Sequence, residues 1–253
     1  TVVDLPDPDE AAPHADPTGP LVVFDDRELF SGDAAIVIQP SMPGWAGRAR
    51  AGRVLAGYAF APIDEAYLRV AGIGPPTAAP ADPRARPTVL VCFGGSDPAD
   101  VTGRIAPGLL GDARWATEVV VGAGYRGDRP EAAAPWAVRD PADLPRRLAV
   151  CDIAVLGAGT MKFEAAFLGR PAILLAAADD QLPVGPAFAA TGAAAFLGDG
   201  RTIDPAAVTA AVARLAADRP ARQRMSERAR EVVDGGGAER LAREIVALAD
   251  RSA

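Results

Sequence analysis

The sequence predicts an α/β protein, with a doubly wound parallel sheet in its C-terminal part and a partial α/β domain before it. After residue 88, short apolar runs alternate with helical patterns, which is typical of a parallel sheet. Two of these runs end in glycine-rich turns, at residues 94–95 and 157–159. The chain has 253 residues, which is enough for two modest domains.

The N-terminal part predicts short strands joined by polar loops. Residues 7–20 are rich in Asp, Pro and Ala and predict a loop, in which the single histidine, His14, is interpreted as solvated. The segment 73–87 contains five prolines and no apolar period. We therefore expect a linker at 73–87 between a partial domain, 1–72, and a second domain, 88–253. The expected strands of the first domain are 1–5, 21–24, 34–38 and 53–56.

The second domain predicts a regular alternation of strands and helices, whose last helix is a candidate to pack back on the first domain. Its expected strands are 89–93, 117–121, 153–156, 172–176 and 194–197. Its expected helices are 98–110, 144–150, 161–168, 204–217, 221–234 and 238–248.

The first glycine-rich turn has the features of an anion-binding loop. Gly94 and Gly95 let the backbone turn sharply after a buried strand and leave their amides exposed. Ser96 and Asp97 are typical of a helix start, and Pro98 suits a first helical turn. Amide groups and the positive end of a helix would then point at one place, as in phosphate sites.

A second turn repeats this arrangement at Gly157, Gly159 and Thr160, and Gly122 follows a further strand. One such turn is as typical of a tight strand-to-helix connection as of a ligand site. Two in one half of an α/β chain favour a nucleotide site, because ligands of such sheets bind at the carboxyl ends of the strands.

Glu164 is the most informative single residue. A capping box with Thr160 as N-cap needs a glutamate three residues later, at position 163, and Glu164 lies one position beyond it, so capping does not explain this residue. It flanks the predicted buried stripe of its helix and could accept hydrogen bonds from both ribose hydroxyls; the alternative is a favourable interaction with the helix dipole. Met161 and Lys162 open the same helix. A lysine there opposes the dipole unless a pyrophosphate lies nearby, and the alternative is a solvated side chain.

Asp179, Asp180 and Gln181 follow the strand 172–176, where substrate groups would lie. The alternative is a helix start with an acidic first turn.

Composition excludes several classes of function. The net charge of −7 argues against nucleic acid or an anionic membrane as a partner. Two cysteines and one histidine fit no usual zinc spacing, so neither a metal nor another cofactor is expected. Cys92 and Cys151 fall in apolar surroundings and predict buried thiols in a reducing, cytoplasmic compartment. No apolar run approaches membrane-spanning length.

Three motifs together resemble the C-terminal half of the GT-B nucleotide-sugar proteins: FGGSDP, GAGTMKFEAAFLGRP and the DDQ after the next strand. The likeness is closest to the UDP-sugar hydrolases of pseudaminic acid biosynthesis and the related spore-coat polysaccharide proteins. It is more distant to the peptidoglycan glycosyltransferase that adds N-acetylglucosamine to lipid. It covers about residues 88–250 well and extends more weakly upstream, where Tyr58 matches a segment that could face the cleft.

This resemblance implies roles for the motif residues. The two glycine-rich turns would hold a diphosphate, Glu164 a ribose, and Asp180 and Gln181 the sugar. Asp180 replaces the family's more frequent Asn or Glu, and Thr160-Met161-Lys162 replaces its usual Ser-Thr. The family's Gly-x-Gly-His loop, whose histidine is the general base, has no counterpart here, so the catalytic residue is unknown.

The function expected from the resemblance is hydrolysis of a nucleotide-sugar, most simply UDP-linked, at its anomeric carbon in polysaccharide or glycoconjugate biosynthesis. Two alternatives stay open. One is a glycosyltransferase on the same scaffold, in which an acceptor hydroxyl replaces water. The other is a non-catalytic nucleotide-sugar binding module that lacks the N-terminal base.

Overall fold

The computed structural model describes residues 1–4, 19–44, 46–72, 86–126 and 137–252. The chain divides into two compact units, one formed by Thr1–Ile63 with Val233–Ala253 and the other by Asp64–Val232. His14 and most of the expected linker 73–87 lie outside the described residues.

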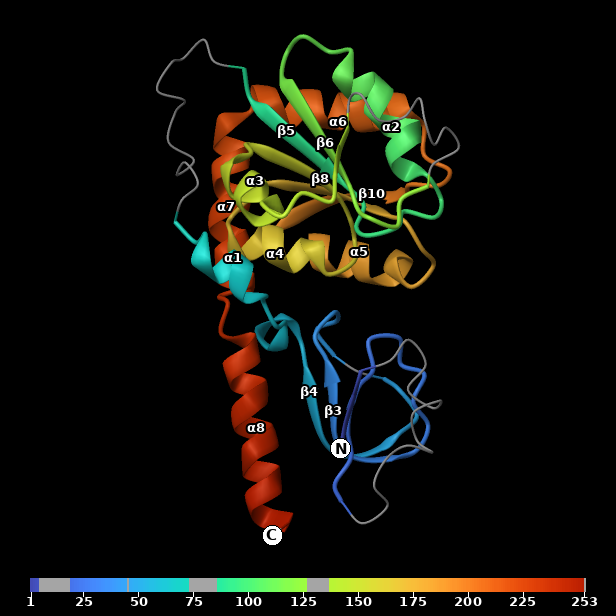
Figure 1. Cartoon of the computed structure of the whole chain (residues 1–253), viewed down its shortest axis with the longest axis vertical. Helices are drawn as coiled ribbons and strands as arrows, with labels where there is room; N and C mark the ends of the chain where they lie inside the picture. Colours follow the sequence, from blue (N-terminus) through green and yellow to red (C-terminus); the bar gives the residue numbers. More distant parts are fainter. Residues whose placement is uncertain (5–18, 45, 73–85, 127–136, 253) are drawn as a thin grey trace. The chain divides into compact units, whose positions relative to one another are not determined.

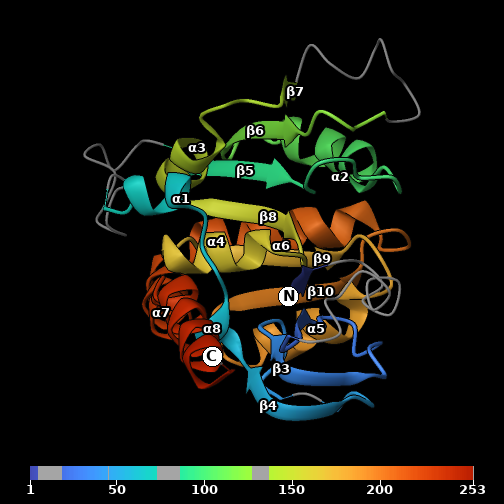
Figure 2. The same cartoon turned by 60° about the horizontal axis from the view of Figure 1, so that its bottom comes forward.

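The second unit contains a six-stranded, all-parallel sheet, which confirms the predicted doubly wound α/β class. Its strands lie in the order β10-β9-β8-β5-β6-β7 (Figure 2). The order reverses between β5 and β8, which makes this pair the topological switch point of the sheet. The strands are β5 (Thr88–Cys92), β6 (Ala116–Val121), β7 (Ala137–Arg139), β8 (Ile153–Gly157), β9 (Ala172–Ala176) and β10 (Ala194–Asp199).

Helices cover both faces of this sheet. They are α1 (Glu65–Arg69), α2 (Val101–Leu110), α3 (Leu144–Val150), α4 (Met161–Phe167), α5 (Gln181–Ala189), α6 (Pro205–Ala217) and α7 (Arg219–Val232). Figure 1 shows α2 and α6 on one face and α4 and α5 on the other. On the first face, Val91 and Val155 of the central strands pack with Ile105 of α2 and Val208 of α6. The helices after β5 and β8 therefore diverge to opposite faces, as a switch point requires.

Most predicted elements of this unit are present, with boundary differences that have local causes. Helix α2 begins at Val101, not at Pro98, because the chain has positive φ at Asp97 (+38°), just before Pro98, and at Asp100 (+50°), just before Val101. Helix α1 and strand β7 were not predicted, and α5 was predicted only as a helix start at Asp179–Gln181, the alternative to a substrate site. Proline at position 186 within α5 hides its helical pattern.

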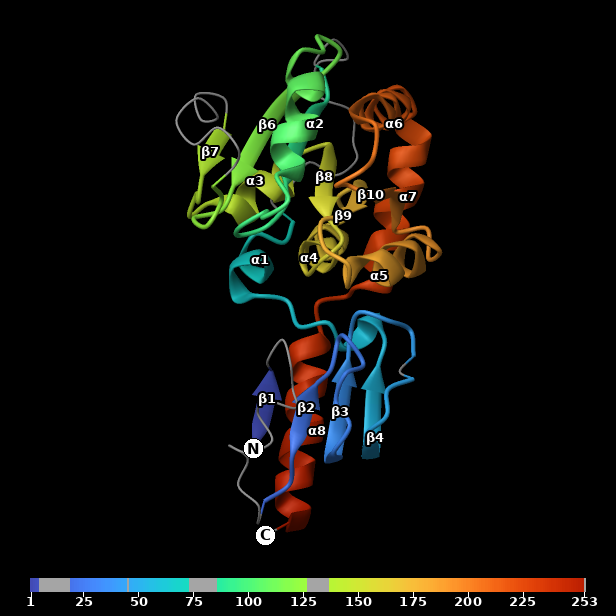
Figure 3. The ribbon, with the colours of Figure 1, turned by 90° about the vertical axis from the view of Figure 1, so that its right-hand side faces the viewer.

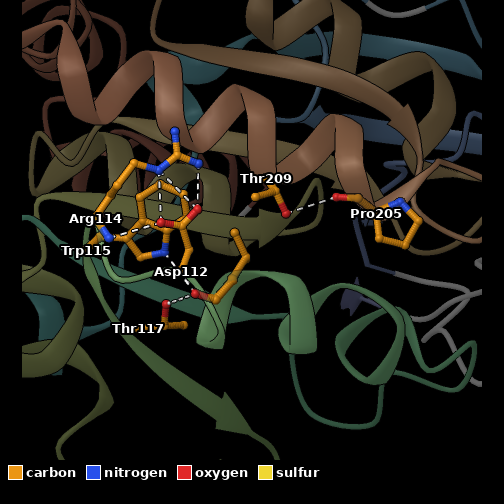
Figure 4. A network of polar contacts seen from close by, with 7 residues as sticks. Asp112, Arg114, Trp115, Thr117, Pro205 and Thr209 are labelled. Atoms are coloured by element: carbon orange, nitrogen blue, oxygen red, sulfur yellow. Dashed lines mark hydrogen bonds and ion pairs between the residues drawn. The ribbon is translucent and has the colours of Figure 1, made fainter.

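The end of α2 is fixed by hydrogen bonds to its last carbonyls (Figure 4). The Leu109 carbonyl accepts from Trp115 Nε1 at 3.0 Å and from Thr117 Oγ1 at 2.9 Å. Arg114 lies 4.9 Å from the Trp115 ring centroid and forms an ion pair with Asp112, whose pKa is lowered to about 2 by hydrogen bonds from the Arg114 side chain and backbone. The Trp115 and Thr117 contacts satisfy the Leu109 carbonyl at a helix end, where partners within the helix are missing.

The first unit is a four-stranded parallel sheet in the order β1-β2-β3-β4, with one long helix along it (Figure 3). The last helix, α8 (Gly237–Ser252), packs Leu241 against Val22, Ile38 and Leu55 of this sheet. The other elements are β1 (Val2–Asp4), β2 (Val22–Phe24), β3 (Asp33–Gln39), β4 (Arg50–Ala56) and the 3₁₀ turn η2 (Tyr58–Phe60). Among the described residues, no helix is both long and apolar enough to cross a membrane.

Candidate functional site

The two glycine-rich turns of the second unit lie beside each other. Strands β5 and β8 pair directly, and Cys92 is level with Leu156, so both turns leave the sheet at the same edge. A Cβ atom added to Gly157 would lie 3.9 Å from Phe93 Cα at the start of the other turn. Both turns therefore lie together at the carboxyl ends of the two central strands.

The first turn is braced by its neighbour after β6. Gly94 has a φ of +83°, which favours glycine, and Gly95 has open space where a Cβ would project. The Gly95 carbonyl accepts a hydrogen bond from Gly124 N at 2.9 Å. A Cβ on Gly122 would lie only 2.4 Å from Gly95 Cα. Gly122 therefore allows a close backbone approach that holds the first turn in place.

Asp97 serves the start of α2. Its side chain is buried, and its two oxygens accept from Val101 N at 3.0 Å and from Thr102 N at 2.8 Å. Asp100 accepts from Gly103 N at 3.0 Å. The amides at this helix start, which we expected to face an anion, are thus already hydrogen-bonded to carboxylates. The part of this loop open to a ligand is the backbone at Gly95 and Ser96.

The second turn is joined by Gln181, which comes from the next strand-to-helix connection. Gln181 Oε1 accepts from Ala177 N at 3.0 Å. Cβ atoms added to Gly157 and Gly159 would lie 3.6 Å from Gln181 Oε1 and 3.5 Å from its Nε2, respectively. The structure therefore brings the predicted Gln181 against the turn. Thr160 precedes α4 without a capping bond from its side chain.

Asp180 and Asp179 are exposed at the start of α5. Asp180 is the N-cap residue, yet its side chain makes no capping hydrogen bond. Asp179 forms an ion pair with Arg201, with Oδ1 and Nη2 2.6 Å apart. Asp179 is therefore held by an ion pair, whereas the neighbouring Asp180 carboxylate makes no capping hydrogen bond.

Lys162 does not match the solvated alternative considered from the sequence. Only 2% of it is exposed, so it is not a solvated lysine. Its Nζ donates to the Gly159 carbonyl at 3.2 Å and lies 3.9 Å from the Phe163 ring centroid. Its ammonium therefore holds the carbonyl side of the second turn, and the expectation of a pyrophosphate near this lysine stays a prediction.

Glu164 is half-buried on α4, where it meets a residue that the sequence did not indicate. The Tyr67 hydroxyl from α1 donates to its carboxyl group, while Glu164 Oε2 is buried and accepts no hydrogen bond from the described residues. Burial raises the pKa of Glu164, and the Tyr67 hydrogen bond partly opposes this shift. A buried acceptor without a donor is costly and marks a place where a ligand hydroxyl would be stabilising.

The remaining predicted residues have clear locations. Tyr58 lies in η2 of the first unit, where burial raises the pKa of its hydroxyl. Met161 is half-buried at the start of α4. Cys92 and Cys151 are free and buried, as expected, and burial raises their pKa values to about 11 and about 12. Within the described ranges, no three His, Cys, Asp or Glu side chains gather as a metal site would require.

The architecture of the chain is similar to that of several solved structures. The calicheamicin glycosyltransferase CalG4 is 25% identical with a TM-score of 0.51, over 68% of this chain and 44% of that one. The chain has the GT-B fold. The glycosyltransferase of kitacinnamycin is also 25% identical, with a TM-score of 0.50, over 67% of this chain and 44% of that one.

A wider structural match confirms the GT-B fold alone. MurG of Acinetobacter baumannii is 16% identical with a TM-score of 0.57, over 88% of this chain and 64% of that one. The chain thus spans less than half the length of the first two GT-B structures and 64% of the third. No family model matches the sequence, and no curated protein matches it.

Proposed function

We propose that this chain is the donor-binding part of a GT-B glycosyltransferase that uses a nucleotide diphosphate sugar. The observation that carries the proposal is the pairing of two glycine-rich turns at the switch point of the second unit's sheet. Such a switch point is where doubly wound sheets bind nucleotides. Glu164 and Gln181 lie on the helices that follow the second turn and the next strand.

Each residue has a chemically distinct part in this proposal. The backbone at Gly95 and Ser96 and at Gly159 and Thr160 faces the diphosphate, since a Cβ on either glycine meets no backbone atom within 3.4 Å and close approach is open. Glu164 accepts from the ribose with Oε2, which has no hydrogen-bond donor among the residues that the structure describes. Gln181, beside the second turn, and the exposed Asp180 face the sugar.

The reaction breaks the bond between the anomeric carbon and the diphosphate oxygen and forms one to an acceptor oxygen. The departing nucleoside diphosphate gains charge, which fixed amide groups stabilise without a metal. The acceptor loses a proton to a base that we do not assign. Transfer is favoured over the hydrolysis expected from the sequence, because the solved structures at 25% identity are named as glycosyltransferases.

Calorimetric titration with UDP, TDP, GDP and UMP tests the proposal. We expect one diphosphate to bind more tightly than its monophosphate, because the two turns would hold both phosphates. Gly159→Ala should weaken that binding while leaving the thermal melt unchanged, since its Cβ meets nothing closer than 3.5 Å. Gly111→Ala, at the end of α2, is the matched control and should alter neither. Failure of every nucleotide to bind the wild type would overturn the proposal.

A further inference from the structure

We propose that Arg170 and Arg230 form a second anion site in the Asp64–Val232 unit, for a small molecule carrying a phosphate or carboxylate on an apolar group. The site is a cavity of about 270 Å³ at the end of α4, bordered by α7 and by the residues after α1. It is independent of the proposed nucleotide site.

The cavity combines an apolar wall with two cations. Val70, Ala71 and Phe167 contribute apolar surface, and the two arginines contribute the charge. Arg170 is only 4% exposed, so its guanidinium is a buried cation. A pocket of this composition suits a ligand with one anionic end and one apolar end, since each end then finds its complement.

The two guanidinium groups converge on a single oxygen. The Leu168 carbonyl accepts from Arg170 Nε at 3.1 Å and from Arg230 Nη2 at 3.4 Å. Like charges this close repel: burial lowers the pKa of Arg170 and Arg230 lowers it further, while Asp152 opposes the shift. Among the described residues, no carboxylate lies within ion-pair distance of Arg230. An anion between the two groups would replace repulsion with charge-assisted hydrogen bonds.

Gly169 makes this arrangement possible. Its φ of +65° ends α4, and a Cβ there would lie 2.4 Å from Arg230 Nε. The missing side chain therefore lets the Arg230 guanidinium lie against the backbone beside Arg170.

The cavity lies at the opposite edge of the sheet from the glycine-rich turns. Arg170 immediately precedes Pro171 and β9, and its Nη1 donates at 3.2 Å to the carbonyl of Cys151, which precedes β8. Both are amino ends of parallel strands, whereas the turns follow carboxyl ends. One ligand therefore cannot occupy both places, and the two sites can be tested separately.

A simpler role for the arginines is to satisfy carbonyl groups at the end of α4 and interact with its dipole. Stability in the absence of added anions does not separate the two accounts, because removing Arg230 takes away both its hydrogen bond to the Leu168 carbonyl and its repulsion of Arg170. Only an anion site predicts saturable binding that depends on Arg230, so binding is the measurement that separates them.

The experiment titrates the whole chain with inorganic phosphate, phenyl phosphate and benzoate by calorimetry, at an ionic strength held constant with chloride. We expect saturable binding, tightest for a probe with an aromatic group, and unchanged by saturating UDP. Arg230→Ala should weaken it about tenfold or more, because a charge-assisted pair is lost. Arg228→Ala is the matched control on the same helix, where the arginine pairs with Glu231 instead, and should bind as the wild type does.

Three results would overturn the proposal. They are no saturable heat with any probe, equal binding by Arg230→Ala, and phosphate binding that Gly159→Ala abolishes while Arg230→Ala retains it. The last would assign the phosphate to the glycine-rich turns. Because UDP binding is measured separately, failure of this site is distinguishable from failure of the proposed function.

Discussion

Cys92 and Leu156 are paired in register at the carboxyl ends of the two central strands of the second unit. This pairing aligns the turn that begins at Gly94 with the turn that follows Gly157. The helices after the two strands lie on opposite faces of the sheet (Figure 1), so the turns diverge and expose backbone between them.

Gly95 of the first turn and Gly122, which follows β6 and packs against that turn, should respond differently to alanine. In Gly95→Ala the added Cβ enters open space, so we expect an unchanged melt and weaker nucleotide binding. In Gly122→Ala the Cβ meets Gly95 Cα at 2.4 Å. That strain should cost about 1–3 kcal/mol of unfolding free energy. Thermal melts and titration of both variants check this, and a stable Gly122→Ala protein would contradict the close contact.

Glu164→Gln should separate ribose recognition from structure. The amide can still accept from Tyr67, but its NH₂ group cannot accept from a ribose hydroxyl. We expect nucleotide affinity to fall roughly ten- to a hundred-fold, from the loss of about 1.5–3 kcal/mol. The preference of the wild type for UDP over 2′-deoxy-UDP should disappear in the variant.

Tyr67→Phe is the control for this substitution, since it removes the donor to Glu164 and keeps the carboxylate. If Glu164 only holds α1 to α4, Tyr67→Phe should lose stability, whereas Glu164→Gln should keep it because its amide oxygen still accepts from Tyr67. Neither variant should then lose nucleotide affinity. Calorimetry of both variants beside urea unfolding distinguishes these outcomes.

Stability should depend on pH through Glu164. Burial raises its pKa in the folded state, so the folded protein binds more protons than the unfolded chain above the ordinary glutamate pKa. The contribution of Glu164 to stability is therefore complete below that ordinary pKa and is lost as pH rises through the folded pKa. Urea unfolding between pH 4 and 8 should show the wild type losing stability relative to Glu164→Gln. Parallel curves for the two proteins would contradict the raised pKa.

Nucleotide binding should not require a divalent metal. In the part of the chain that the structure describes, no cluster of metal-binding side chains is present, and the turns offer amide donors to a diphosphate instead. UDP titrations with EDTA and with added Mg²⁺ should give the same affinity. A large loss of affinity on chelation would show that a metal bridges the phosphates.

The sequence by itself determined the alternating strands and helices of the second unit and the places of its glycine-rich turns. These features depend on short-range properties, namely apolar runs of strand length and glycines directly after them. The same reasoning placed Glu164 and Gln181 near the second turn, because residues that follow neighbouring parallel strands meet at one edge. It offered the start of α5 only as an alternative and missed the extent of this helix, because proline inside the helix obscured the pattern.

Only the tertiary structure decided how the polar side chains are used. The sequence could not show that Lys162 turns to the Gly159 carbonyl, or that Tyr67 reaches Glu164 from a helix almost a hundred positions away. Nor could the sequence show that Arg230 and Arg170 donate to the same carbonyl, since no periodic pattern links residues of α7 with the start of β9. The physical reason is that a charged side chain's partner is set by packing between distant segments, whereas a strand or a turn is encoded within a few residues.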